Sequence, residues 1–305
     1  MSTNELFELE RALPDDQLAA SGDRLIGFAA RYDRFERDLR LLVDVDGLEA
    51  WSKTPYNRRL PLLDALADRY PLVVFHGDVG TGKTATAEAT AARLAATQRG
   101  ESMLFKLSTR VRGSGKVGEM SHLINKAFAA IVEEAGKTRT AYLVLDEADS
   151  LTASRAQGHS HHEDKVAVNT LIQKIDNLRR YGGRILVFLC TNRFDALDPA
   201  ILRRAFRVER FARPSAEERR ALFEHDLAGI DLDTGTLSLL VELTGPNGTN
   251  PAYTFSDLRT RLLPNALARA FPDRPLTSED LLAAAKDIAP TPRLTDNPPS
   301  QDRQS

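Results

Sequence analysis

The chain has 305 residues, of which 42% are hydrophobic and 28% charged, and its 41 lysines and arginines face 43 acids for a net charge of −2. The hydrophobic share allows a sizeable core, and the near-neutral charge argues against a dedicated duplex-DNA binder, which is normally strongly basic. The single cysteine, Cys190 in the apolar run ILVFLC, excludes a disulfide framework, and no apolar stretch reaches the roughly 18 residues of a membrane span, so we expect a cytoplasmic protein.

The first part of the sequence predicts an arm and two helices. Residues 1–21 are polar and are expected to form an N-terminal arm, and their acidic start lacks the apolar region of a signal peptide. From Arg24 to Leu42, apolar residues recur at spacings of three and four, which indicates an amphipathic helix. A second helical stretch, 57–70, ends before Pro71.

Strands and helices then alternate as far as residue 211. The predicted strands are 72–76, 103–108, 141–146, 185–190 and 207–211, and the predicted helices between them are 82–97, one that ends near 135, 164–180 and 198–205. Apolar strands that do not alternate and are separated by helices indicate a parallel sheet covered by helices on both faces. The fold class is therefore α/β.

The pattern changes after Pro214. The stretches EERRALFEHDLAGI, DTGTLSLLVELTG, FSDLRTRLLPNALARAF and TSEDLLAAAKDIA predict four helices with no strand between them. We therefore expect a large α/β domain over 22–212, a small helical domain over 213–290 and a disordered tail over 291–305.

The strongest functional signal is GDVGTGKT, which matches the phosphate-loop pattern G-x-x-x-x-G-K-[ST]. It follows a predicted strand and opens a predicted helix, and this context argues against a glycine-rich turn that matches by chance. Backbone N–H groups and the helix N-terminus would hold the phosphates of ATP, Lys83 would reach the β- and γ-phosphates, and the Thr84 hydroxyl would bind Mg²⁺. The expected nucleotide-binding residues are Gly77, Asp78, Val79, Gly80, Thr81, Gly82, Lys83 and Thr84.

Acidic and amide side chains follow the third and fourth predicted strands. Asp146 and Glu147 end the apolar run 142–145, and Asn192 follows the run 185–190. A carboxylate at the end of a buried strand can hold the water shell of Mg²⁺, so we expect Asp146 at the metal and at the nucleotide, and Glu147 to orient and deprotonate the attacking water. Asn192 is expected to hydrogen-bond the γ-phosphate or its water. The alternative for Glu147 is a helix-capping acid, which the independent phosphate loop disfavours.

Two arginines, Arg203 and Arg204, lie on the short predicted helix 198–205. They are either solvated surface charges or arginine fingers that reach the γ-phosphate of a neighbouring subunit and stabilise transition-state charge. The presence of Glu147, Asn192 and Arg203 together argues against a nucleotide-binding switch with little turnover.

These motifs together carry a family resemblance. GDVGTGKT, LVLDEAD, the TN after the fourth strand and LDPAILRR, followed by a helical lid, resemble AAA+ ATPases over about residues 22–290. DEADSLTASR, VNTLIQKIDNLRRYGGRILVFLCTN, SGK after the second strand and LRTRLLPNALARA further resemble the pachytene-checkpoint family of HORMA-domain remodellers. Only about 20 residues precede the first helix, fewer than the adaptor-binding domain of eukaryotic members needs. In its short N-terminal segment the chain resembles the bacterial members of the family, which are encoded with HORMA proteins and cyclic-oligonucleotide synthases in anti-phage defence.

The resemblance implies an activity and an assembly. It implies an ATPase that remodels a HORMA-domain protein and forms a homo-hexameric ring, with ATP at subunit interfaces and the two arginines acting in trans. It also implies a lid arginine that contacts the nucleotide. The family spacing, two residues after a serine, points to Leu258, so Arg259 is assigned to this role, with Arg261 as the alternative. Family phosphate loops usually have two prolines where Asp78 and Val79 stand here.

A basic glycine-rich loop, KLSTRVRGSGKVGE at 106–119, follows the second strand. The loop is not needed for phosphate binding, because GDVGTGKT already provides it. Nucleic-acid binding would require aromatic side chains that stack on bases, and the loop has none. In AAA+ unfoldases the corresponding loop faces the pore and grips substrate. We therefore expect a peptide-gripping loop formed by Arg110, Val111, Arg112 and Gly113, with a solvated surface loop as the alternative.

Three histidines, His159, His161 and His162, occupy the segment that forms a second pore loop in this family. A metal-site interpretation is disfavoured because no cysteine is near and HHED does not match H-E-x-x-H. A different class of function remains open, a nucleic-acid-associated AAA+ ATPase of the clamp-loader or transposition-helper type. The near-neutral charge disfavours it, and DNA-stimulated ATPase activity would favour it.

Overall fold

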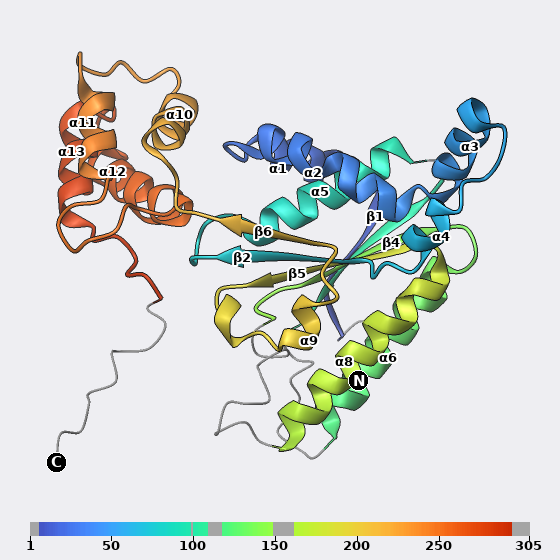
Figure 1. The fold of residues 1–305 in the computed structure, drawn as a ribbon. Coiled ribbons are helices and arrows are strands. Elements are labelled where there is room, and N and C mark those ends of the chain that lie inside the picture. Colours follow the sequence, from blue (N-terminus) through green and yellow to red (C-terminus); the bar gives the residue numbers. More distant parts are fainter. Residues whose placement is uncertain (1–5, 99, 109–117, 149–161, 295–305) are drawn as a thin grey trace. The chain divides into compact units, whose positions relative to one another are not determined.

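The computed structural model describes residues 6–98, 100–108, 118–148 and 162–294. Its centre is a six-stranded sheet with the strand order β1-β3-β4-β5-β2-β6 (Figure 1). The strands are β1 (Phe7–Leu13), β2 (Leu72–Gly77), β3 (Ser102–Leu107), β4 (Thr140–Leu145), β5 (Ile185–Thr191) and β6 (Arg207–Phe211). The pairs β3–β4, β4–β5 and β5–β2 are parallel, and β1 pairs antiparallel with β3. The predicted sheet is confirmed, and β1 joins it as an antiparallel edge strand.

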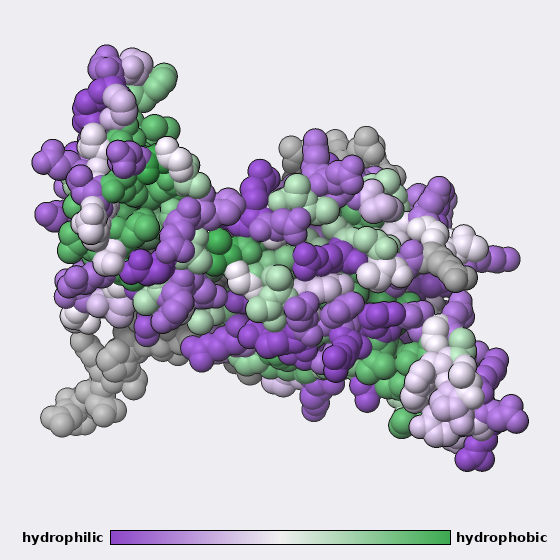
Figure 2. Space-filling view, turned by 90° about the horizontal axis from the view of Figure 1, so that it is seen from above, coloured by the Kyte–Doolittle hydropathy of each residue, from purple (hydrophilic) through white to green (hydrophobic). Residues whose placement is uncertain are grey.

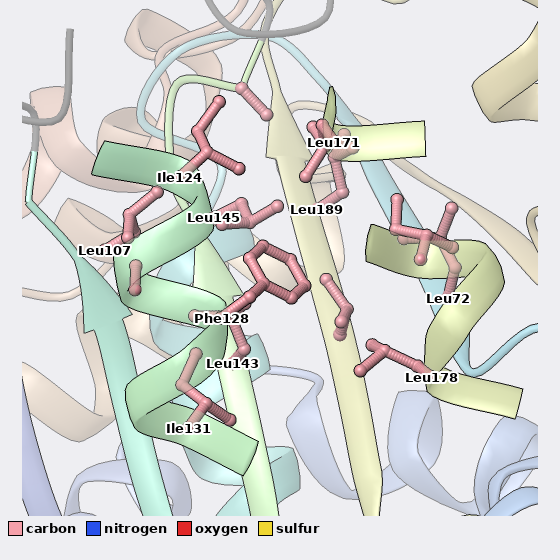
Figure 3. Packing of buried hydrophobic residues seen from close by; sticks show 14 of the residues in the cluster. Leu72, Leu107, Ile124, Phe128, Ile131, Leu143, Leu145, Leu171, Leu178 and Leu189 are labelled. Atoms are coloured by element: carbon pink, nitrogen blue, oxygen red, sulfur yellow. The ribbon is translucent and has the colours of Figure 1, made fainter. Parts of the chain in front are cut away.

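Helices cover both faces of this sheet. The helices α2 (Phe28–Val43) and α5 (Lys83–Thr97) lie on one face, and α6 (Glu119–Ala135) and α8 (His162–Leu178) lie on the other (Figure 1). The core on the α6–α8 face includes Leu72, Leu107, Ile124, Phe128, Ile131, Leu143, Leu145, Leu171, Leu178 and Leu189 (Figure 3). On the α2 face, the ring centroid of Phe75 lies 5.9 Å from that of Phe35 and 5.7 Å from that of Phe188. Successive strand residues are therefore buried on opposite faces, which explains the apolar runs without alternation.

The N-terminal part differs from the sequence prediction. The expected polar arm contains β1 and the helix α1 (Asp16–Asp23), because Phe7 and Leu13 are buried against the sheet while the residues between them are partly or fully exposed. An edge strand of this kind has a weak apolar pattern. The helix α3 (Val45–Tyr56) was not predicted. The predicted stretch 57–70 shrinks to α4 (Leu62–Ala67), because Asn57 caps α3 in the left-handed conformation and Pro61 precedes the new helix.

Short elements complete the region around β5 and β6. The 3-10 helices η3 (Arg179–Tyr181) and η4 (Phe194–Ala196) flank β5. The helix α9 (Pro199–Leu202) begins after Asp198, whose side chain accepts a hydrogen bond from the Ala200 N–H at 2.8 Å. This Asp–Pro start is a favourable N-terminus. The helix is shorter than the predicted 198–205, and the two predicted arginines follow it, with Arg203 as its C-cap residue.

The chain divides into two compact units. The α/β unit comprises the chain up to His76 together with Thr84–Arg210, and the helical unit comprises Gly77–Lys83 together with the chain from Phe211 onward. The helical unit contains α10 (Ala216–Asp226), α11 (Thr236–Leu243), the π-helix η5 (Asp257–Leu262), α12 (Leu263–Ala270) and α13 (Ser278–Asp287). Capping boxes begin α10 and α13, and the predicted helices after Pro214 are all present.

The face of the protein seen in Figure 2 is mainly polar. Hydrophilic residues cover most of the face shown in Figure 2, with hydrophobic residues scattered among them. Scattered exposed apolar side chains of this kind are ordinary for a protein surface. Among the described residues, no helix is long and apolar enough to cross a membrane.

Candidate nucleotide site

The predicted acids and the asparagine of the α/β unit lie at one edge of the sheet. In the parallel pairing Leu145 is opposite Leu189, so β4 and β5 both end at the same edge. Asp146 leaves β4 at this edge, and Asn192 leaves β5 there. The strand β2 ends there too, because His76 pairs with Thr191. The carboxyl edge of a parallel sheet is where ligands bind in α/β folds.

Glu147 has an unusual backbone conformation. Its φ of 47° is in the left-handed region, which non-glycine residues rarely adopt. The Glu147 N–H donates to Asp146 Oδ1 at 2.9 Å, and the Ala148 N–H donates to the Cys190 carbonyl at 2.9 Å. The turn after β4 is therefore tied both to its own carboxylate and to β5. Strained conformations of this type cluster at functional sites. Here the turn leaves the Glu147 side chain exposed.

Lys106 on β3 is a site residue that the sequence analysis missed. Its Nζ lies 3.2 Å from Glu8 Oε1, 3.7 Å from Glu88 Oε1 and 3.8 Å from Asp146 Oδ2. Burial alone would lower the pKa of Lys106, but the surrounding carboxylates outweigh burial and raise it. Burial raises the pKa of Glu88, although Lys106 acts in the opposite direction. The lysine thus balances the negative charge beside Asp146, and no motif in the sequence signalled this contact.

Thr84 and Asp146 suit the Mg²⁺ that the sequence predicts. Both belong to the α/β unit, Thr84 is half-buried in the first turn of α5, and the Asp146 side chain is 30% exposed. A hydroxyl and a carboxylate are hard oxygen donors of the kind that Mg²⁺ prefers, and Mg²⁺ with nucleotides is usually held by one or two protein groups plus phosphates. Among the described residues, no group of three or more His, Cys, Asp or Glu side chains could hold a metal ion. The oxygen donors of Thr84 and Asp146 fit a metal that is bound together with phosphates.

The phosphate loop of the helical unit adopts a conformation that needs glycine. Gly77, Gly80 and Gly82 have φ values of 144°, 73° and 89°. A Cβ on Gly77 would lie 2.0 Å from the carbonyl oxygen of Phe211. Lys83 is buried, and its Nζ donates to the carbonyl oxygens of Gly77 at 3.0 Å and Asp78 at 2.7 Å. The ammonium group of Lys83 thus binds neutral carbonyl oxygens of its own loop. Phosphate oxygens are charged and would accept stronger hydrogen bonds than these carbonyls.

The two predicted arginine fingers differ from each other. Arg204 is half-buried, and its guanidinium pairs in two places with the Asp176 carboxylate of α8, including Nη2 to Oδ2 at 2.9 Å. It also donates to the Ala200 carbonyl at 2.9 Å and lies over the Tyr70 ring at 5.3 Å. Arg203 is exposed. The geometry therefore gives Arg204 an internal packing role and leaves the Arg203 side chain exposed, and contact of either arginine with a neighbouring subunit stays a prediction.

Arg259 and Arg261 lie on η5 of the helical unit. Arg259 pairs with the Asp226 carboxylate of α10, with Nε to Oδ2 at 2.6 Å and Nη2 to Oδ1 at 2.9 Å. Arg261 pairs with Asp257 at 2.9 Å. Both arginines are thus engaged with acids of their own unit, and contact of Arg259 with nucleotide stays a prediction.

Several predicted functional residues lie outside the described ranges. They are the expected gripping residues Arg110, Val111, Arg112 and Gly113 and the histidines His159 and His161. His162 is the first residue of α8.

Comparisons with known proteins agree with these features. The model for the AAA family, described as "ATPase family associated with various cellular activities", matches residues 73–213. The "CD-NTase-associated protein 6" of Escherichia coli strain KTE188 is 51% identical over 97% of this chain and 100% of that protein. The protein of the same name from E. coli strain MS 115-1 is 38% identical over 97% of this chain and 98% of its own length.

Solved structures give the same picture. A chain of the E. coli MS115-1 HORMA:CdnC:Trip13 complex matches with a TM-score of 0.88 and 36% identity, over 97% of this chain and 99% of that one. Rhizobiales Trip13 matches with a TM-score of 0.71 and 34% identity, over 94% and 99% of the two chains. Caenorhabditis elegans PCH-2, at 19% identity and a TM-score of 0.66 over 91% of this chain and 73% of that one, shares the fold.

Proposed function

This chain belongs to the CD-NTase-associated protein 6 family of AAA ATPases, and we propose that it uses ATP hydrolysis to remodel a HORMA-domain protein in bacterial anti-phage signalling. The observation that carries the proposal is the 51% identity over the full length of such a relative. A match with 36% identity over nearly the whole chain, in a complex of HORMA, CdnC and Trip13, supports a HORMA-domain partner. ATPase activity follows from the family itself.

We assign nucleotide binding to the phosphate loop. Its backbone N–H groups would hold the phosphates, and Lys83 would exchange the carbonyl oxygens of Gly77 and Asp78 for phosphate oxygens. Thr84 and Asp146 would hold Mg²⁺, which neutralises charge on the phosphates when it is bound.

We assign the hydrolytic step to residues at the carboxyl edge of the sheet. Glu147 would take a proton from the attacking water, since its carboxylate is exposed on a turn that is fixed on both sides. Asn192, at the end of β5, would orient the same water or the γ-phosphate. Arg203 would act across a subunit interface on the developing charge.

The assembly and domain limits belong to the same proposal. We propose a homo-hexameric ring in the cytoplasm, with residues 22–212 as the large ATPase domain, 213–290 as the lid and 291–305 as a tail. The exposed Arg203 supports action in trans, because a finger must be accessible to a neighbour. The pore grip is assigned to residues 110–113.

Peptide release tests the proposed activity. The purified chain, with ATP and Mg²⁺, is mixed with a HORMA-domain protein closed around a labelled peptide, and peptide release is followed. We expect release that requires ATP and is lost in the Lys83→Ala variant. Val111→Ala and Arg110→Glu should stop release while basal hydrolysis continues, and Arg58→Glu, at an exposed arginine between α3 and α4, serves as the matched control.

The outcomes separate the alternatives. ATP hydrolysis without peptide release from a HORMA-domain protein would refute the remodelling function. Hydrolysis stimulated by DNA and not by a HORMA-domain protein would favour the nucleic-acid-associated class. Normal release by both loop variants would refute the assignment of the grip to residues 110–113.

A further inference from the structure

A partly buried ion pair joins the phosphate loop to the rest of the helical unit. Asp78 is the second residue of the loop, and its Oδ2 accepts a hydrogen bond from Arg213 Nε at 2.7 Å. The Arg213 side chain is 7% exposed and that of Asp78 is 19% exposed. The two residues are 135 positions apart in the sequence. The pair is therefore a tertiary contact, and it is shielded from solvent.

Arg213 also reaches a second segment. Its Nη1 donates to the carbonyl oxygen of Ala252 at 2.6 Å, so one guanidinium holds both the phosphate loop and the segment that leads into η5. Its Nη2 is buried and has no hydrogen-bond partner among the described residues. A buried donor without a partner costs free energy, because it has lost its hydrogen bonds to water. The other contacts of the guanidinium must outweigh this cost.

The same segment contacts the loop next to Asp78. The Ser256 N–H donates to the Gly80 carbonyl at 3.1 Å. A Cβ on Gly80 would lie 2.7 Å from Ser256 Cβ and 2.8 Å from Thr254 Oγ1, so the loop packs closely against the residues that precede η5. The loop thus has an ionic contact and a packing contact with the helical unit.

The loop needs such support. Three of its glycines have positive φ, and glycine loses more conformational freedom on ordering than any other residue. A loop of this composition has little stiffness of its own, and a nucleotide that bound a disordered loop would have to order it at the expense of affinity. An external contact that fixes the loop removes this cost before the nucleotide arrives.

We infer that Arg213 is a positioning residue for nucleotide binding: through Asp78 and Ala252 it holds the phosphate loop in its binding conformation and makes the loop one body with the helical unit. The inference rests on the proposed nucleotide site. It adds a residue from the C-terminal part of the chain that acts through the loop and does not itself touch phosphate.

The test measures ATP binding by calorimetry in EDTA, where hydrolysis does not proceed. Asp78→Asn and Arg213→Gln should each weaken ATP binding about tenfold, which corresponds to about 1.4 kcal/mol. The double variant should bind no more weakly than Arg213→Gln alone, because that change already removes the contact with Asp78. Arg213→Lys keeps a charge for Asp78 but not the guanidinium that also reaches Ala252, so it should bind ATP more tightly than Arg213→Gln and more weakly than the unchanged chain. Arg220→Gln alters an exposed arginine of α10 and should bind ATP normally.

Circular dichroism and thermal melting confirm that each variant is folded, and Asp78→Asn, which keeps the shape of a partly exposed side chain, preserves the test if Arg213→Gln does not fold. Normal ATP binding by folded Asp78→Asn would overturn the inference. Losses that add in the double variant would also overturn it, because they indicate two separate contributions. A chain that binds no ATP in its unchanged form would refute the proposed function itself, so the two failures are distinguishable.

Discussion

Arg203 and Arg204 are neighbours in the sequence, yet the structure predicts opposite consequences when each is replaced by alanine. Arg204→Ala removes the paired hydrogen bonds to Asp176 and the contact with Tyr70. Arg203→Ala removes an exposed side chain. We therefore expect the first variant to lose stability and the second to lose hydrolysis.

The magnitude for Arg204 follows from its surroundings. A charged hydrogen bond contributes about 1.5–3 kcal/mol when shielded, and an exposed ion pair contributes about 0–1 kcal/mol. The Arg204 and Asp176 side chains are 21% and 30% exposed, which places this pair between the two cases. We expect a loss of about 1–2 kcal/mol in the free energy of unfolding, or about 2–8 °C in Tm for a unit of this size. For Arg203, loss of an arginine finger predicts a fall in turnover of about 10³-fold with ATP binding retained.

Differential scanning fluorimetry measures Tm, calorimetry measures ATP binding, and phosphate release measures turnover. Mixing Arg203→Ala with Lys83→Ala should recover part of the turnover, because some interfaces then pair an intact loop with an intact finger. Equal loss of turnover in Arg204→Ala without any change in Tm would refute the assignment of separate roles. Failure of the mixture to recover turnover, with assembly confirmed by mass, would refute action in trans.

Three further variants test other features of the molecule. Glu147→Gln should bind ATP normally and hydrolyse it at least about 10²-fold more slowly, and undiminished phosphate release would remove Glu147 from proton transfer. Gly183→Ala should cost about 3 kcal/mol in urea unfolding, because its φ is 77° and a Cβ would lie 1.9 Å from a backbone carbonyl oxygen, whereas Gly182→Ala, with φ of 57° and open space, should cost about 1 kcal/mol; equal costs would contradict this reasoning. Burial by itself raises the pKa of Asp257, but hydrogen bonds, the strongest from Thr291, outweigh burial and lower it. A carboxyl group whose pKa is lowered by folding stabilises the folded state at pH values above its ordinary pKa of about 3.9. This contribution is lost as the pH falls through the lowered pKa. Asp257→Asn should therefore have a lower Tm at pH 7 and a smaller fall in Tm below about pH 4, and an unchanged acid dependence would contradict this.

The sequence by itself determined the features that reside in short, contiguous segments. The phosphate loop is readable because eight successive residues carry its chemistry, and its glycines do have the positive φ that the pattern requires. Asp146 and Asn192 are readable because each follows an apolar run, and parallel pairing then brings such strand ends to one edge. The four strands β2 to β5 were also predicted from short contiguous segments, since burial on both faces leaves a continuous apolar run that is visible in the sequence.

Only the tertiary structure decided which distant residues meet. β1 is half-exposed at an edge, so its apolar pattern was too weak to predict its pairing with β3. Lys106 reads as an ordinary strand lysine until folding brings Asp146 within 3.8 Å of it. The sequence does not distinguish Arg204 from Arg203, and only the structure shows that Arg204 pairs with Asp176 of α8. Arg213 belongs to no motif, and only the structure shows its contact with Asp78. Such contacts depend on how whole elements pack, and packing is set by the sum of many buried side chains, so no local pattern records it.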